Sequence, residues 1–302
     1  CDDDANPNDQ YHVFNLRIKD TEINQGTGYA VTYYPSLALA QAGVTGTEIA
    51  TPTAYQNMNP QHPAVQTLGV VVTTPDGCKS ITTLDIRVLP IPTPRTNPPA
   101  LAPKCDDNLP GDMLEVFDLT VNEAYIRNND PNLTFHYYRT QADAQNDVNE
   151  IPFPATALVG DNVWIRVENN RVDYLGNNCY VLVEQALTVN PLPTVIQPLA
   201  PYRVCDNDAD GLAQFDLTSP ILAPLILGTA TTNQQPSDYT ITYHATPGNA
   251  ASGAAPLVSP YTNGTPTAEN IYIRVVNNAT GCVNATGVLP LAVEAYATET
   301  GP

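Results

Sequence analysis

Apolar and polar residues alternate over short runs along most of the chain, and turn-forming residues separate one run from the next. Successive side chains of a β-strand point to opposite faces, so alternation with a period of two is typical of strands with one buried face. The pattern offers no convincing 3.6-residue helical stripe. The chain is therefore predicted to be all-β, built from short antiparallel strands.

The same three strands recur three times in the same order. Each copy has an aromatic strand, a strand that precedes a cysteine and a closing strand. They lie at 31–34, 69–72 and 84–88, at 135–138, 163–167 and 185–189, and at 241–244, 271–275 and 288–293. A period of about 100 residues predicts three tandem immunoglobulin-like β-sandwiches of roughly seven strands each, covering residues 1–104, 105–204 and 205–302.

Two further features repeat with this period. A brief patch after each aromatic strand, at 36–42, 141–145 and 247–251, is expected to form one or two helical turns. Proline-rich stretches at 89–94 and 190–194 follow the first two copies. Proline segments act as semi-rigid spacers, so the three domains are expected to form an extended array with proline-rich linkers.

The charge balance limits the partners. The chain has 31 acidic against 12 basic residues and a net charge of −19, which repels nucleic acid and anionic membrane surfaces. No apolar run is long enough to span a bilayer, and the sequence starts with neither Met nor a signal peptide. We expect no nucleic-acid partner and no direct membrane insertion, and we expect the secretion signal and any anchor to lie outside this sequence.

The six cysteines form two series. One opens each copy and the other precedes each closing strand, and the sequence has no C-x-x-C pair of the kind that binds zinc. A duplicated unit should be able to close its own bond, so the predicted disulfides are Cys1–Cys78, Cys105–Cys179 and Cys205–Cys282. Closing each loop would contribute about 4 kcal/mol. The alternative is six free buried thiols.

Each copy opens with acidic residues. In the third, Asp206, Asp208 and Asp210 alternate before Gly211, and Asp216 follows on the next strand. Alternate carboxylates on a tight turn can converge on Ca²⁺, which binds six to eight oxygens. The candidate ligands of the other copies are Asp2, Asp4, Asn6, Asp106, Asn108, Asp112 and Asp118. The alternative is that these acids are solvated turn residues, and no Glu completes an EF-hand loop.

Catalytic motifs are missing from the sequence. The four histidines stand beside no nucleophile motif and at no zinc spacing, and no phosphate-binding glycine loop is present. We therefore expect no enzymatic activity. The tyrosines and Trp164 offer two interpretations, packing within the strands or a stacking platform for carbohydrate.

The combined repeat resembles that of the giant, type IX-secreted surface adhesins of gliding Bacteroidota, the SprB-type adhesins. The third copy carries it most fully, as Cys-Asp-x-Asp-x-Asp-Gly, Phe-Asp-Leu-Thr, Ile-Tyr-Ile-Arg-Val and a second cysteine. The first copy departs from it at Asn15 and lacks the arginine. The resemblance implies display outside the outer membrane, and a filament that mediates attachment and gliding through secretion and gliding machinery bound elsewhere in the protein.

Two other functions remain open at this stage. One is a lectin-like module that binds surface polysaccharide through exposed tyrosines and the acidic loops. The other is a train of spacer domains within a larger secreted protein, including one that carries an enzyme elsewhere. In each case the nearest partners are neighbouring repeats of the same chain.

Overall fold

A computed structural model describes the chain except for residues 3–8, 59–64, 153–156, 174 and 296–302. The described chain forms two compact units. The first comprises Cys1–Pro99, Leu119–Pro152 and Asn162–Gln185, and the second Ala100–Asp118, Phe153–Asp161 and Ala186–Pro302. Repeat 1 and the main sheet of repeat 2 thus belong to the first unit, while repeat 3 and the smaller sheets of repeat 2 belong to the second.

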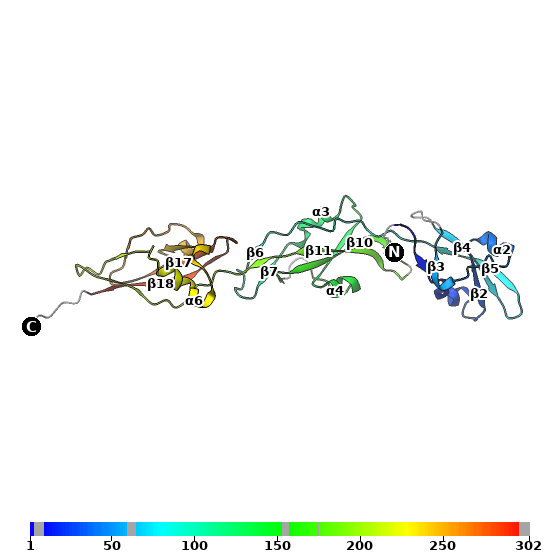
Figure 1. The fold of residues 1–302 in the computed structure, drawn as a ribbon, viewed down its shortest axis with the longest axis horizontal. Coiled ribbons are helices and arrows are strands. Elements are labelled where there is room, and N and C mark those ends of the chain that lie inside the picture. The colour runs from blue at the N-terminus through cyan, green and yellow to red at the C-terminus, as the bar shows by residue number, and fades with distance from the viewer. Residues whose placement is uncertain (3–8, 59–64, 153–156, 174, 296–302) are drawn as a thin grey trace, which may run out of the picture. The chain divides into compact units, whose positions relative to one another are not determined.

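Strands account for most of the regular structure in all three repeats (Figure 1). Repeat 1 contains β1 (Val13–Phe14), the 3₁₀ helix η1 (Leu16–Lys19), α1 (Asp20–Ile23), β2 (Ala30–Tyr34), α2 (Leu37–Ala42), η2 (Pro52–Ala54), β3 (Tyr55–Gln56), β4 (Gln66–Thr73) and β5 (Lys79–Ile86). Repeat 2 contains β6 (Lys104–Cys105), β7 (Leu114–Val116), η3 (Leu119–Asn122), α3 (Glu123–Ile126), β8 (Thr134–Tyr138), α4 (Gln141–Asn146), β9 (Ala157–Val159), β10 (Asn162–Val172), β11 (Asn178–Ala186) and β12 (Val189–Asn190). Repeat 3 contains β13 (Tyr202–Cys205), β14 (Gln214–Phe215), α5 (Leu222–Leu227), α6 (Thr229–Thr232), η4 (Pro236–Asp238), β15 (Tyr239–His244), α7 (Pro247–Ser252), β16 (Tyr261–Thr262), β17 (Ala268–Asn277) and β18 (Val283–Glu294).

The three predicted strands of each repeat form its main sheet. The aromatic strand (β2, β8 or β15) pairs antiparallel with the next strand (β4, β10 or β17), which lies beside the closing strand (β5, β11 or β18). Smaller antiparallel pairs, β1–β3, β7–β9 and β14–β16, complete the repeats. The prediction of an all-β, immunoglobulin-like antiparallel fold is confirmed.

Alternating apolar side chains supply the cores. In repeat 1, Tyr33 of β2, Leu68 and Val70 of β4 and Leu16 of η1 are buried together. In repeat 3, the side chains of Ile271, Ile273 and Val275 on β17 are inside, joined by Phe215, Leu222, Ile226 and Leu291. The period of two in the sequence thus reports the buried face of each strand.

The three predicted helical patches are α2, α4 and α7. Ser36, Thr140 and Thr246 precede them, and each side-chain oxygen accepts the backbone N–H three residues later. Such a cap satisfies one of the N–H groups that a helix leaves unpaired at its start. Seven residues after each cap, a residue in the left-handed region ends the helix: Gly43, Asp147 and Gly253.

In repeats 2 and 3, the segment that carries the opening cysteine runs parallel to the last strand of its own repeat. In repeat 3, β13 aligns Cys205 with Glu294 of β18. In repeat 2, β6 aligns Cys105 with Asn190 of β12. In repeat 1, the N–H of Asp2 donates to the carbonyl of Leu89 over 2.8 Å. The opening cysteine therefore lies where the closing strand of its repeat finishes.

The proline-rich stretches are hydrogen-bonded to neighbouring parts of the chain. Before repeat 3, the N–H of Ile196 donates to the carbonyl of Ile226 over 2.8 Å, and Val195 and Leu199 pack on the core of repeat 3. Asn284 of β18 donates to the carbonyl of Pro193. Proline cannot donate to a ladder but its carbonyl can accept, so such a stretch suits the edge of a domain.

The stretch before repeat 2 is bound to the first unit in the same way. The N–H of Arg95 donates to the carbonyl of Ile126 over 3.0 Å. The amides of Asn122 and Gln185 both donate to the carbonyl of Pro99, over 2.7 and 3.1 Å. These contacts make the segment part of repeat 2 rather than a hinge before it.

Candidate functional site

Two disulfides join consecutive repeats. Cys1 of repeat 1 bonds to Cys179 of repeat 2, with Cα atoms 5.6 Å apart. Cys105 of repeat 2 bonds to Cys282 of repeat 3, with Cα atoms 5.5 Å apart. The opening cysteine of one repeat is thus linked each time to the second cysteine of the next.

The predicted pairings within repeats, Cys1–Cys78, Cys105–Cys179 and Cys205–Cys282, are therefore wrong. The reason is the parallel pairing of the opening segment. In repeat 3, Cys205 lies beside Glu294 at the end of β18, whereas Cys282 directly precedes the first residue of that strand. Twelve strand residues separate the two positions by about 40 Å, and a disulfide needs Cα atoms within about 7 Å.

Two cysteines have no bond within the described chain. Cys78 and Cys205 are both exposed. Cys78 occupies the position in repeat 1 that Cys179 and Cys282 occupy in the later repeats, and Cys205 occupies the opening position of Cys1 and Cys105. Both are thus equivalent in sequence position to bonded cysteines.

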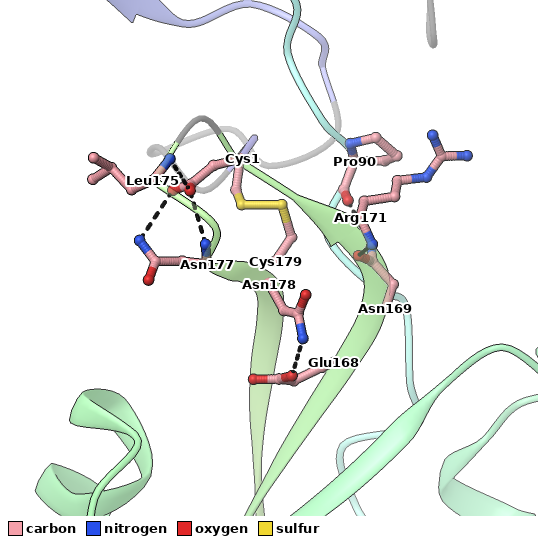
Figure 2. Close-up of a disulfide and its surroundings, with 10 residues drawn as sticks. Cys1, Pro90, Glu168, Asn169, Arg171, Leu175, Asn177, Asn178 and Cys179 are labelled. Carbon is pink, nitrogen blue, oxygen red and sulfur yellow. Dashed lines mark hydrogen bonds between the residues drawn. A yellow bond between two sulfur atoms is a disulfide. The ribbon is translucent and has the colours of Figure 1, made fainter.

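Hydrogen bonds made by side chains surround the first joint (Figure 2). The amide of Asn169 on β10 donates to the carbonyl of Pro90 over 2.8 Å, and its oxygen accepts the N–H of Arg171. Beside Cys179, the amide of Asn178 donates to Glu168, whose carboxylate is buried. Pro90 directly follows Leu89, which holds Asp2. The disulfide thus lies within a hydrogen-bonded contact between the end of repeat 1 and the hairpin of repeat 2.

The second joint repeats part of this arrangement. The N–H of Asp106, next to Cys105, donates to the carbonyl of Asn190 over 2.9 Å. The N–H of Lys104 donates to the carbonyl of Thr188, also over 2.9 Å. Cys282 is buried. The opening segment is therefore fixed on both sides of its cysteine before the bond crosses to the next repeat.

The aspartate that directly follows each opening cysteine holds the next loop through hydrogen bonds. Asp2, Asp106 and Asp206 are buried, and their carboxylates accept loop N–H groups. Asp2 accepts from Gln10, Asp106 from Gly111 and Met113, and Asp206 from Asp208, Ala209 and Gly211. The N–H of Gly211 holds the pKa of Asp206 below its usual range, because it stabilises the charged carboxylate.

Among the described residues, only the acidic segment after Cys205 brings several carboxylates together. One oxygen each of Asp206, Asp208 and Asp210 lies within 4.8 Å of the others. The negative charge of Asp210 raises the pKa of the exposed Asp208. Together with Gly211, these acids match positions 1, 3, 5 and 6 of a calcium loop, and hard carboxylate oxygens are the ligands Ca²⁺ prefers.

Among the described residues, the other predicted ligands are not part of such a cluster. Asp4 and Asn6 lie outside the described residues. Asp112 caps its own turn by accepting the N–H of Leu114, and Asp216 likewise accepts the N–H and hydroxyl of Thr218 and the hydroxyl of Ser259. Asn108 and Asp118 are exposed. In repeat 2, the buried Glu115 accepts the N–H groups of Asp107 and Asn108, a role that sequence reasoning missed.

An all-β chain of repeated immunoglobulin-like domains, with disulfides between consecutive repeats, defines a class of tandem-domain protein suited to an oxidising, exported environment. The chain belongs to the family of the Flavobacterium inter-domain disulphide bond domain, FIDD, whose profile matches residues 1–92, 102–193 and 201–296. Three consecutive copies fit a repeat segment of a larger surface protein. No helix among the described residues is long and apolar enough to cross a membrane.

Solved structures of other tandem-domain proteins are similar only in a general way. Immunoglobulin domains 1–5 of Sidekick-1 share 9% identity over 89% of this chain and 54% of theirs, with a TM-score of 0.24. Mouse cadherin-23 EC22-24 shares 10% over 88% and 86%, with a TM-score of 0.26. A 1.5-MDa bacterial ice-binding adhesin shares 11% over 89% and 88%, with a TM-score of 0.24. With TM-scores this low, none of these three structures bears on the function of the chain. No curated protein matches the chain.

Proposed function

We propose that this chain is a non-catalytic stalk segment of a large secreted adhesin at the cell surface, outside the outer membrane. The observation that carries the proposal is the pair of bonds Cys1–Cys179 and Cys105–Cys282, each of which links one repeat covalently to the next. A stalk that holds a cell to a surface must transmit tension, and covalent joints do so without relying on contacts between domains.

The two free cysteines extend the same arrangement. Cys205 would bond to the second cysteine of a following repeat, and Cys78 to the opening cysteine of a preceding one, because both occupy equivalent and exposed positions. The partners of this chain are then neighbouring repeats of the same protein. Attachment to surfaces and gliding would depend on the whole protein, including the secretion and gliding machinery that other parts of it engage.

Attachment of living cells tests the proposal. In the producing bacterium, replacing the three repeats by three unrelated immunoglobulin-like domains should preserve attachment to glass under flow if the segment is a stalk, whereas deletion of the adhesive tip should abolish it. Antibodies against the segment should label intact cells. Labelling only after permeabilisation, or loss of attachment on replacement with surface display intact, would contradict the stalk.

The lectin-like alternative is not favoured by any described contact. The aromatic strands bury four of their tyrosines, Tyr33, Tyr34, Tyr138 and Tyr243. Their rings pack inside the domains and are not exposed to stack on a sugar. A glycan array probed with the purified chain should therefore give no micromolar binding. A hit that is lost on replacing the exposed Tyr29 and Tyr125 with alanine would restore the alternative.

We further propose that repeat 3 binds a structural calcium ion through Asp206, Asp208 and Asp210. The support is their convergence within 4.8 Å and the mutual repulsion that a cation would relieve. Calcium should raise the melting temperature of the native chain, and the Asp208→Asn/Asp210→Asn variant should lose that rise in a thermal scan with Ca²⁺ or EDTA. Asp112→Asn, which alters an acid in repeat 2, is the matched control. An unchanged melting temperature with Ca²⁺ would contradict the site.

A further inference from the structure

We propose that the staggered disulfides form a short covalent path that carries tension around the folded repeats instead of through them. From Cys1 the path crosses the bond to Cys179 and then follows the backbone to Cys205, 26 positions further on. The backbone from Cys1 to Cys205 without the bond is 204 positions long. Most of repeats 1 and 2 therefore lies on a closed loop beside the path.

Much of the backbone part of this path is β-strand. It begins as strand β11, continues through β12 and four prolines, at positions 191, 193, 198 and 201, and ends as β13. Strands rise about 3.3 Å per residue and proline-rich segments about 3.1 Å, against at most about 3.6 Å for a fully stretched chain. The strand portions of the path have little slack, so tension would lengthen them only slightly.

The segment is also held in place along its length. In the second unit, Ile196 bonds to Ile226, Pro193 accepts from Asn284, and the side chain of Gln197 donates to the carbonyl of Val288 on β18. The parallel pairing of β13 with β18 then fixes its last residues. These contacts hold the last part of the path against repeat 3.

A second path starts one repeat later. Cys105 bonds to Cys282, and the backbone then continues along the closing strand β18 of repeat 3. If Cys205 bonds to a following repeat, as the proposed function requires, the two paths alternate and each advances two repeats for every 26 or so residues. Such a tether resists extension, whereas a row of independent domains would lengthen as each one unfolded.

Single-molecule stretching between Cys1 and Cys205 tests the inference on the three-repeat chain. One handle is a tag fused before Cys1 and the other is attached to the exposed thiol of Cys205, with Cys78→Ser to leave a single reactive thiol. The 26-residue path limits the stretched length to about 95 Å plus the width of the disulfide. The oxidised chain should reach that length and no more.

Two double variants separate the contributions of the bonds. Cys1→Ser/Cys179→Ser opens the path. The intact Cys105–Cys282 bond still bypasses part of the chain, so the shortest covalent route runs from Cys1 to Cys105 and from Cys282 back to Cys205. That route has 181 positions, and the stretched length should rise to about 650 Å. Cys105→Ser/Cys282→Ser removes the other disulfide but leaves this path closed, so it should still stop near 95 Å. An oxidised chain that extends by several hundred ångströms would overturn the inference. The proposed stalk function is tested separately, by the attachment of cells. The stalk function and the covalent path can therefore each be refuted without the other.

Discussion

The arginine of the penultimate strand acts as a helix cap. Arg274 on β17 donates to the carbonyls of Ala250 and Ala251, over 3.0 and 2.7 Å, at the end of α7. A helix leaves its last carbonyls without partners, and a cation also complements the negative end of the helix dipole. Arg166 makes the same two contacts with α4. The recurring arginine is therefore structural.

Replacing Arg274 with methionine should destabilise repeat 3 by about 1–3 kcal/mol, because the methionine keeps the apolar stem but leaves two carbonyls of α7 without their charged donor. Urea denaturation followed by circular dichroism measures the change. Arg203→Met is the control, since the side chain of Arg203 is 59% exposed and pairs only with Glu294, and should cost less than about 1 kcal/mol. Equal effects of the two variants would refute the capping role.

Repeat 1 replaces this arginine by Val71 and brings α2 onto the sheet at a glycine. A Cβ atom at Gly69 would lie 2.5 Å from both the carbonyl oxygen of Ser36 and the Cβ of Ala40. The register-equivalent residues of the other repeats are Trp164 and Tyr272, so the close approach belongs to repeat 1.

Gly69→Ala should therefore destabilise repeat 1 by about 1–3 kcal/mol through overpacking. Gly248→Ala is the control, because nothing lies within 4 Å of a Cβ at that helical position, and alanine there should be neutral or stabilising by up to about 1 kcal/mol. Thermal unfolding of both variants gives the comparison. A Gly69→Ala chain that melts like the parent would show that α2 can shift at no cost.

The residue types alone predicted the acidic segments that follow the opening cysteines. They did not predict which aspartates are buried and which are exposed. Asp206 is buried and accepts three loop N–H groups, whereas Asp208 and Asp210 are exposed. In the sequence, an aspartate that binds a cation looks the same as one that accepts the N–H groups of a turn. Only the positions of the surrounding N–H groups distinguish them.

At the scale of elements, the strands and the three capped helices could be predicted because period-two alternation and Ser or Thr caps are local signals. Helices α1, α3 and α6 could not, since each has only four residues and no amphipathic repeat. In the sequence, the proline-rich stretches look like spacers, because a spacer and the edge of a domain have the same composition. Their partners lie about 30 to 90 residues away, such as Ile226 for Ile196 and Asn284 for Pro193.

Hydrogen exchange distinguishes a bound edge segment from a free spacer. The backbone N–H of Ile196 bonds to Ile226 and that of Thr194 to the side chain of Gln234, so both should exchange far more slowly than in the urea-unfolded chain. Mass spectrometry of peptides covering residues 192–200 gives the rates. Exchange as fast as in the unfolded chain would mean that the stretch before repeat 3 is a free linker after all.

At the scale of the molecule, the repeat number could be predicted and the disulfide connectivity could not. Cysteine spacing within a repeat shows that two thiols belong to one domain, but not that they lie at opposite ends of it. That separation follows from the parallel pairing of β13 with β18 and of β6 with β12, which is a long-range feature of the fold.

The staggered connectivity is the central claim, and peptide mapping without reduction tests it most directly. The oxidised chain, alkylated before digestion, should give one cross-linked peptide pair containing Cys1 and Cys179 and another containing Cys105 and Cys282. Cys78 and Cys205 should carry the alkyl group. Cross-linked peptides joining Cys1 to Cys78, or Cys205 to Cys282, would contradict the account.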